Sequence, residues 1–280
     1  MRFVPRLRWL AKPSARIAGT SVLALATIAL ASPADGATSG LAARIAAAVR
    51  LSPGAAPQGA TFAGTAAVGT LFTVSDGTVG NHFCTASVVH SPHGNLLITA
   101  AHCVAGQSGT IAFVPGYDNG KTPYGIWYVS RVFVDQAWSA SSSVDDDVAF
   151  LQVDSDSAGM QIEAVTGGER LGLNEAAGQL TDVIGYPEGS NSPVACDNQT
   201  TAFTVPSTGT TQLEFDCGGY PDGTSGGPFL TQVNKTTGLG TVTGVIGGYE
   251  QGGDSPSVSY SAPFGSSADT LYQTAVAASG

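Results

Sequence analysis

Charged residues are scarce in this chain of 280 residues. Asp, Glu, Lys and Arg make up 11% of it, against about 25% in a typical soluble domain. Lys and Arg number only 11 against 21 Asp and Glu, so the formal net charge is −10. A chain so poor in cations cannot neutralise a row of phosphates, which excludes nucleic-acid binding as its main function.

Good helix formers are also few. Glu, Lys and Leu are sparse, whereas Gly (37 residues), Thr and Ser are abundant, which argues against helical bundles and coiled coils. Intrinsic disorder is not expected, because hydrophobic residues reach 42% and can build a core. Beyond residue 31 no apolar run is long enough to span a membrane.

The N-terminus carries five of the eleven cations in its first sixteen residues, followed by an apolar run at 17–31 that ends in Ala29-Leu30-Ala31. This layout is typical of a secretory signal peptide. A membrane anchor is the alternative, but the run of about fifteen residues is shorter than the about 20 that a bilayer requires. We expect export and removal of residues 1–31. The exported chain would keep six cations against 21 acids, a balance of −15 that disfavours nucleic acid and anionic membranes.

Residues 32–61 are rich in Ala, Pro and Gly. We expect a propeptide or flexible linker there, with a flexible N-terminus of the mature protein as the alternative. The polar stretch 154–159 divides the remainder into two expected domains, 62–156 and 157–280.

The sequence has four cysteines and no CxxC pair: Cys84, Cys103, Cys196 and Cys217. An even number in an exported protein predicts two disulfides, for which three pairings are possible. We expect the first to pair with the second and the third with the fourth. Each bond then closes a loop of about twenty residues and stabilises the fold by about 3 kcal/mol. A zinc site that uses His82 or His102 is the alternative.

Short segments rich in β-branched and aromatic residues follow one another beyond residue 62, separated by Gly, Pro, Asn and Asp. Six lie in each half: 68–74, 83–89, 96–100, 110–114, 125–134 and 148–153, then 180–184, 200–205, 212–217, 228–233, 241–248 and 257–262. Only 268–278 has apolar residues at helical spacing. We predict an all-β fold of two packed six-stranded antiparallel β-barrels with a C-terminal helix.

Three short motifs carry side chains with catalytic chemistry. An apolar strand leads to His102 beside Cys103, Asp147 stands directly before the apolar stretch 148–151, and Ser225 lies in a Gly-rich turn at 222–228. Singly they would be a buried His, a strand cap and a turn Ser. Together they suit acyl transfer, in which an imidazole oriented by a carboxylate takes the proton of a Ser hydroxyl. The negative charge that develops on the attacked carbonyl oxygen, the oxyanion, needs preorganised N–H donors. The backbone N–H groups of Gly223 and Ser225 are the candidates.

The order of these residues along the chain discriminates between folds. The segment 223–227 also fits the G-x-S-x-G elbow of α/β-hydrolases, but that fold needs a His after the Ser, and all four His precede it. A subtilisin-like order could use Asp76, yet Asp76 lies in a Ser-Asp-Gly turn and the helices of that fold are missing from the pattern. The order His, Asp, Ser is that of double-barrel enzymes.

Segments 99–103, 147–151 and 223–228 resemble the three signature motifs of the chymotrypsin/trypsin-like serine proteases. Segment 83–88 resembles the strand whose Cys pairs with the Cys after the catalytic His. The resemblance covers roughly residues 62–275. Because it also carries an export signal, the chain is similar to the bacterial, glutamyl-endopeptidase-like branch of this family. The resemblance implies Ser225 as nucleophile, His102 as general base and then acid, and Asp147 as the group that orients it. The N–H groups of Gly223 and Ser225 would form the oxyanion hole.

The sequence departs from this family in several places. Thr224 replaces the acid that pairs with a new N-terminus after zymogen cleavage, so we expect no activation by that ion pair. Gly219 replaces the Asp that binds Arg or Lys in trypsin-like members. Gly247 replaces a hydroxyl that helps to hold the catalytic Asp, and Ile246 replaces the pocket His of glutamyl-specific members. The residues that we expect to bind substrate are Gly219, Tyr220, Asp222, Gly247, Gly248 and Tyr249.

These observations predict a secreted, monomeric serine endopeptidase that works through an acyl-enzyme on protein or peptide substrates. We expect no cofactor, no metal, and no nucleic-acid or membrane partner. The alternative from another class is a non-catalytic double-barrel module that binds a protein, against which the intact triad argues. Asp145 and Asp146 could hold a structural Ca²⁺, although two adjacent acids are more often a solvated turn.

Overall fold

The structure, a computed structural model, describes residues 56–279. The predicted signal peptide (1–31) and most of the predicted propeptide or linker (32–61) lie outside the described residues, and the division into domains at 156/157 stays a prediction.

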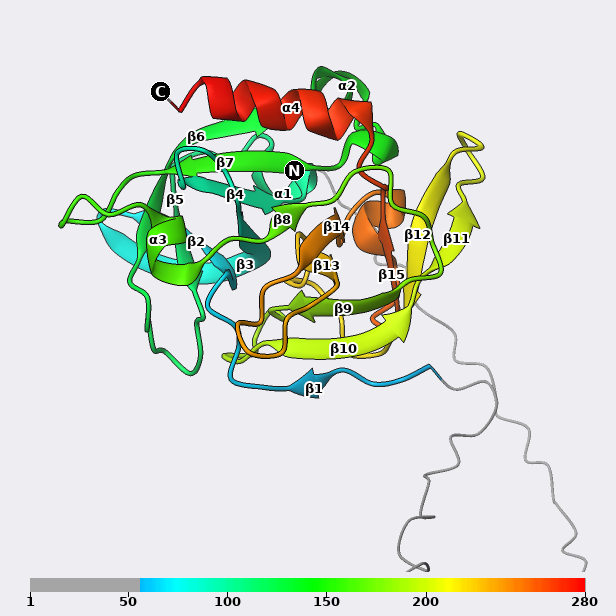
Figure 1. Cartoon of the computed structure of the whole chain (residues 1–280), viewed down its shortest axis with the longest axis horizontal. Helices are drawn as coiled ribbons and strands as arrows, with labels where there is room; N and C mark the ends of the chain where they lie inside the picture. Colours follow the sequence, from blue (N-terminus) through cyan, green and yellow to red (C-terminus); the bar gives the residue numbers. More distant parts are fainter. Residues whose placement is uncertain (1–55, 280) are drawn as a thin grey trace, which may run out of the picture. The chain divides into compact units, whose positions relative to one another are not determined.

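A closed barrel of six strands forms the first half, with neighbours in the order β2-β3-β4-β7-β6-β5 (Figure 1). Leu97, Phe113 and Phe150 are fully buried in its core. This barrel confirms the first six predicted segments, because each strand lies on one of them. The bounds are β2 (Val68–Ser75), β3 (Thr78–Val89), β4 (Leu96–Thr99), β5 (Thr110–Pro115), β6 (Trp127–Val134) and β7 (Ala149–Val153).

The second half consists of two sheets, one of six strands in the order β1-β10-β9-β13-β14-β8 and one of three in the order β11-β12-β15. Val183, Phe215 and Phe229 are fully buried in its core. The bounds are β1 (Ala60–Thr61), β8 (Arg170–Leu171), β9 (Leu180–Gly185), β10 (Val194–Gln199), β11 (Thr201–Thr204), β12 (Thr211–Asp216), β13 (Pro228–Thr231), β14 (Thr241–Val245) and β15 (Val258–Ser261).

Three of these strands were not among the predicted segments. β1 and β8 have only two residues each, too few for a periodic signal. β10 carries Asp197, Asn198 and Gln199, polar types that are depleted or neutral in strands, and it forms because it pairs along its whole length with β9.

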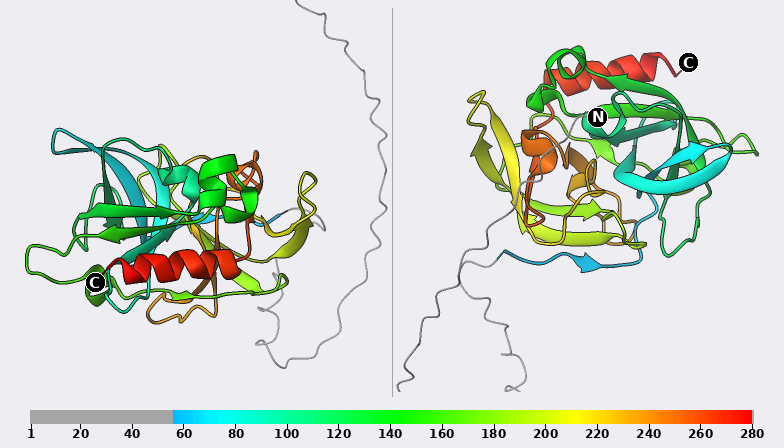
Figure 2. Two further views of the ribbon diagram at one scale, coloured as in Figure 1. Left: turned by 90° about the horizontal axis from the view of Figure 1, so that it is seen from above. Right: turned by 180° about the vertical axis from the view of Figure 1, so that it is seen from behind.

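Helices are short except at the C-terminus. α4 contacts β6 and β7, and Tyr272 lies edge-on to Phe150 with ring centroids 5.6 Å apart, so the helix that follows the second half returns to the first barrel (Figures 1 and 2). In residues 56–279 no helix combines the length and the apolar character needed to cross a membrane. The bounds are α1 (Ala101–Val104), α2 (Gln136–Ser141), η1 (Val144–Asp146), α3 (Ile162–Thr166), η2 (Tyr249–Gly252) and α4 (Ser266–Ala277).

The first described residues are held against the second half. The Gly59 N–H donates to the Gly218 carbonyl and the Gly218 N–H to the Pro57 carbonyl, both at 2.8 Å, and β1 then pairs with β10. The end of the stretch predicted as propeptide or linker is therefore structured, next to the segment that leads into the candidate site.

Glu169 is a fully buried carboxyl group where the halves meet. Its backbone bonds to both Val88 and His90 at 2.8 Å, and its Oε2 accepts a hydrogen bond from the Gly240 N–H. Its Oε1 has no hydrogen-bond partner among residues 56–279. Burial raises the pKa of Glu169 from 4.5 to about 7; the Gly240 N–H opposes this rise and Asp182 adds to it.

Glu169→Gln is expected to stabilise the protein at pH 8. Between pH 4.5 and 7 this glutamate is deprotonated in the unfolded chain but still protonated in the folded one. The contribution of Glu169 to the wild-type free energy of unfolding therefore falls with rising pH, by about 3 kcal/mol in total. A glutamine at this position does not titrate, so the variant does not lose this stability. The difference in free energy of unfolding between Glu169→Gln and wild type should therefore shrink to below about 1 kcal/mol at pH 5. Urea unfolding at both pH values measures this, with the exposed Glu188→Gln as control. If the difference in free energy of unfolding between Glu169→Gln and wild type is the same at pH 5 and at pH 8, the account is contradicted.

Candidate active site

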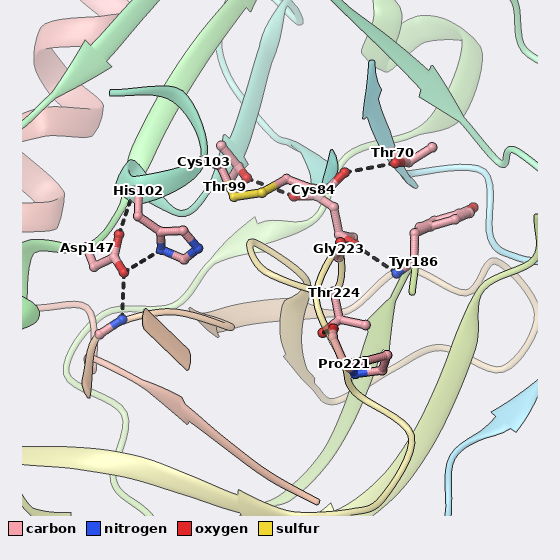
Figure 3. Close-up of a disulfide and its surroundings, with 12 residues drawn as sticks. Thr70, Cys84, Thr99, His102, Cys103, Asp147, Tyr186, Pro221, Gly223 and Thr224 are labelled. Atoms are coloured by element: carbon pink, nitrogen blue, oxygen red, sulfur yellow. Dashed lines mark hydrogen bonds and ion pairs between the residues drawn. A yellow bond between two sulfur atoms is a disulfide. The ribbon is translucent and has the colours of Figure 1, made fainter. Parts of the chain in front are cut away.

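His102 lies in the single turn of α1, directly after the buried strand β4. Its neighbour Cys103 forms a disulfide with Cys84 on β3, and Cys196 pairs with Cys217, so both predicted pairings are present. Figure 3 shows the first disulfide beside the His102 ring. The bond ties the turn that carries His102 to the barrel wall, which limits the movement of its backbone.

Asp147 accepts three hydrogen bonds and is almost fully buried, with 3% of its surface exposed. Oδ1 accepts from the His102 backbone N–H at 2.9 Å, while Oδ2 lies 2.8 Å from His102 Nδ1 and accepts from the Gly248 N–H at 2.8 Å (Figure 3). Because a carboxylate can only accept, this contact requires the hydrogen on Nδ1 and leaves Nε2 free to take a proton.

Gly248 supplies a contact that the sequence did not reveal. At the preceding position a Cβ on Gly247 would lie 2.9 Å from Asp147 Oδ2. The missing side chain at 247 therefore leaves room for the carboxylate, and a backbone N–H provides the additional hydrogen bond.

Ser225 lies in the segment Pro221–Ser225, which we call the oxyanion loop, directly before Gly226. A Cβ on Gly226 would lie 2.1 Å from Thr99 Oγ1 and 2.3 Å from the Thr85 carbonyl, and its φ is +78°. Only glycine fits there, so the turn after Ser225 is packed tightly against the first barrel.

Every carbonyl of the oxyanion loop accepts a hydrogen bond from the protein. The donors are Thr224 Oγ1 to Pro221, Glu188 N to Asp222, Thr85 Oγ1 to Gly223, Gly227 N to Thr224 and Thr85 N to Ser225, at 2.6–3.0 Å. Within residues 56–279 the N–H groups of Gly223 and Ser225 have no such partner. In a trans peptide the N–H points away from the C=O, so fixing the carbonyls of residues 222 and 224 also fixes these two N–H groups. The loop thus presents two unpaired, oriented donors.

A cavity of about 720 Å³ brings these groups together. Its lining includes His102, Gly223 and Ser225, with Asp147 behind His102. Among the described residues the Ser225 hydroxyl has no hydrogen bond to His102. Such contacts are often long in free enzymes and shorten when substrate binds.

The cavity wall is acidic. Among its lining residues are four carboxylates and no Lys or Arg: Glu188, Asp222, Glu250 and Asp254. All four are exposed at the surface, so their field acts on an approaching substrate and weakens with salt.

The predicted substrate-binding residues divide into two groups. Tyr220 and Asp222 line the cavity, and the buried Tyr220 hydroxyl donates to the Val183 carbonyl at 2.6 Å. Burial raises the pKa of Tyr220, and Asp182 and Asp197 add to this, so the hydroxyl stays protonated. The other four lie outside the lining: Gly219, Gly247, Gly248 and Tyr249. Ile246 and the segment 250–256 line it instead.

The side chains of the alternative zinc and Ca²⁺ sites are engaged in other bonds. Cys84, His102 and Cys103 bring ligand atoms within 4.8 Å, but both sulfurs are in a disulfide and offer no thiolate. Asp145 accepts from Thr210 and Gln212, whereas Asp146 accepts from Ser143 and Ser267, so the two carboxylates are directed to different partners.

Comparison with known proteins gives one family and many similar folds. The family described as trypsin-like peptidase domain matches residues 84–239, more than half of the chain. The protease Anisep from Arthrobacter nicotinovorans is 24% identical, with a TM-score of 0.66 over 78% of this chain and 98% of that one. The thermostable serine protease AL20 from an extremophilic microorganism is also 24% identical, with a TM-score of 0.64 over 76% and 98%. A Glu endopeptidase is 17% identical, with a TM-score of 0.59 over 79% and 97%. No curated protein matches significantly.

Proposed function

Because the chain belongs to the family of trypsin-like peptidases, we propose that it is a secreted serine endopeptidase that works through an acyl-enzyme. The observation that carries this proposal is the joint geometry around the cavity. A His is fixed by a buried carboxylate, a Ser lies on the same cavity, and two N–H groups beside it are held without partners.

In the proposed reaction His102 Nε2 takes the Ser225 proton as Oγ attacks the peptide carbonyl. Asp147 stabilises the imidazolium that forms, and the Gly223 and Ser225 N–H groups stabilise the oxyanion. His102 then gives its proton to the leaving amine, which departs and leaves an ester on Ser225. Water, activated by the same His102, cleaves that ester and releases the acid product.

Export is supported by the two disulfides, which persist in oxidising compartments. A non-catalytic binding module is less well supported, since such a protein has no need of a buried carboxylate fixed behind a His or of oriented, unpaired N–H donors.

A peptide-library digest tests the proposal and its substrate class together. We expect cleavage within peptides and enrichment of Lys and Arg near the cleaved bond over Asp and Glu, because the cavity wall carries four carboxylates. Higher salt should reduce this enrichment. Gly219 offers no acid for a single specific contact, so we expect a preference spread over several positions. Failure to cleave any peptide would contradict the proposed function, whereas cleavage preferring acidic peptides would contradict only the electrostatic account.

A further inference from the structure

Thr85 on β3 is fully buried and all of its polar groups are used. Its Oγ1 donates to the Gly223 carbonyl at 3.0 Å and accepts from the Tyr186 N–H at 2.8 Å. Its backbone N–H donates to the Ser225 carbonyl at 2.8 Å, and its carbonyl accepts from Thr99 Oγ1 at 2.7 Å. Thr85 thus connects the first barrel to two carbonyls of the oxyanion loop and to the segment after β9.

The peptide unit to which the Thr85 hydroxyl donates lies in the middle of the oxyanion loop. The Gly223 carbonyl belongs to the unit between residues 223 and 224, which lies between the two units that carry the unpaired N–H groups of Gly223 and Ser225. Gly223 has φ of +90° and no Cβ to restrict rotation. The two flanking units are each held through their carbonyls by one bond, from Glu188 N and from Gly227 N. Without the Thr85 hydroxyl the central unit would keep only the bond from its own N–H to the Pro221 carbonyl at 3.2 Å, which would loosen the segment that joins the two donors.

The residue before Ser225 does not provide an ionic anchor for the loop. Thr224 is buried, and its Oγ1 donates within the loop, to the Pro221 carbonyl at 2.7 Å (Figure 3). Within the part of the chain that the structure describes, the hydrogen bonds that other segments make to the loop are therefore neutral, and the Thr85 hydroxyl bonds to two segments, at Gly223 and at Tyr186.

We propose that Thr85 is a positioning residue that keeps the oxyanion hole formed, through its hydroxyl bridge between Tyr186 N and Gly223 O. The inference rests on the proposed function, since it assigns a part in the same reaction. The hydroxyl stabilises the oriented loop and touches neither substrate nor reacting atoms. Its effect should therefore fall on the transition state and leave substrate binding nearly unchanged.

The test compares Thr85→Val with Thr85→Ser and Thr70→Val. Thr70 is an equally buried threonine of the same barrel whose Oγ1 donates to the Cys84 carbonyl at 2.8 Å and does not bond to the oxyanion loop (Figure 3). Loss of an oxyanion donor lowers rates by about 10²–10³, so we expect partial loss of orientation in Thr85→Val to lower kcat about 10- to 100-fold, with KM within about threefold. The kcat of Thr85→Ser, which keeps the hydroxyl, and that of Thr70→Val should stay within about threefold of the wild-type value.

A peptide aldehyde separates positioning from general damage to the fold, because it forms a tetrahedral adduct whose oxygen occupies the oxyanion hole. Its Ki should rise in Thr85→Val by the same factor as kcat falls, while the Ki of the matching product acid stays constant. Equal kcat in Thr85→Val and wild type, or equal losses in Thr70→Val, would overturn the inference.

Folding is checked by thermal melts, with Thr85→Ala as a second variant should Val not fold. If neither folds, Thr85 acts in stability alone and the inference is wrong. Wild-type activity is measured first: an inactive wild type contradicts the proposed function, whereas an active wild type with an unaffected Thr85→Val contradicts this inference only.

Discussion

Ser225→Ala is expected to lower kcat for peptide hydrolysis by about 10⁶-fold, because it removes the atom that forms the acyl-enzyme. KM should change little, since the methyl group fits the space of the hydroxymethyl and the cavity lining stays intact. Rates on a chromogenic ester and peptide, measured together with melting temperatures, give this result.

The matched control is Ser139→Ala. Ser139 is an exposed serine on α2 whose hydroxyl, within residues 56–279, bonds only to the Asp135 carbonyl, so this variant should keep wild-type rates. A folded Ser225→Ala protein that retains more than about one per cent of kcat would show that another group is the nucleophile, given the losses known for serine nucleophiles.

Asp147→Asn is expected to lower kcat about 10⁴-fold in a folded protein. The wild-type carboxylate accepts from three N–H donors, His102 N, His102 Nδ1 and Gly248 N. An amide has one accepting oxygen, so in either orientation its NH₂ group faces a donor. Where the NH₂ group faces the ring, Nδ1 becomes the acceptor and the hydrogen moves to Nε2, which can then no longer take the Ser225 proton.

Asp146→Asn provides the control for Asp147→Asn. Asp146 accepts from the hydroxyls of Ser143 and Ser267, which can rotate to suit an amide. We expect activity within about threefold of wild type, since these contacts lie outside the triad. If both variants lose activity equally, general destabilisation of the turn is the cause and Asp147 has no special role.

Much of the fold was accessible from the sequence, because local chemistry determines it. The twelve predicted strand segments follow from β-branched and aromatic runs bounded by turn residues, and all of them overlap strands of the structure. β10 was missed because its second half is polar, and the β9 pairing that stabilises it involves residues distant in the sequence.

For the candidate site, the sequence provided the side chains but not the backbone donors. His102, Asp147 and Ser225 could be found because their motifs are local. Gly248 N–H has no sequence signature, since every residue except proline carries such a group. Thr85 was recognised only as part of a strand, because its bond to Gly223 spans 138 residues and depends on the way in which the halves pack.

The acidic wall of the cavity could not be predicted from the sequence either. Glu188, Glu250 and Asp254 come from segments that contain no motif, and only the folded chain brings them beside Asp222. The resemblance to serine proteases placed Gly247 where a hydroxyl would help to hold the catalytic Asp, and in the structure Gly247 lies against Asp147. The Gly219 N–H donates to the Pro256 carbonyl, and the part of Gly219 and Gly247 in substrate binding stays a prediction.

The central claim is that Ser225 is an activated nucleophile, and covalent labelling tests it most directly. A fluorophosphonate reacts with the hydroxyl oxygen of an activated serine, forms an O–P bond and loses fluoride. Intact-mass analysis of the wild-type protein should show one adduct, and peptide mapping should place it on Ser225, with no adduct in Ser225→Ala. A folded wild-type protein that stays unlabelled, or is labelled at another residue, would contradict the account.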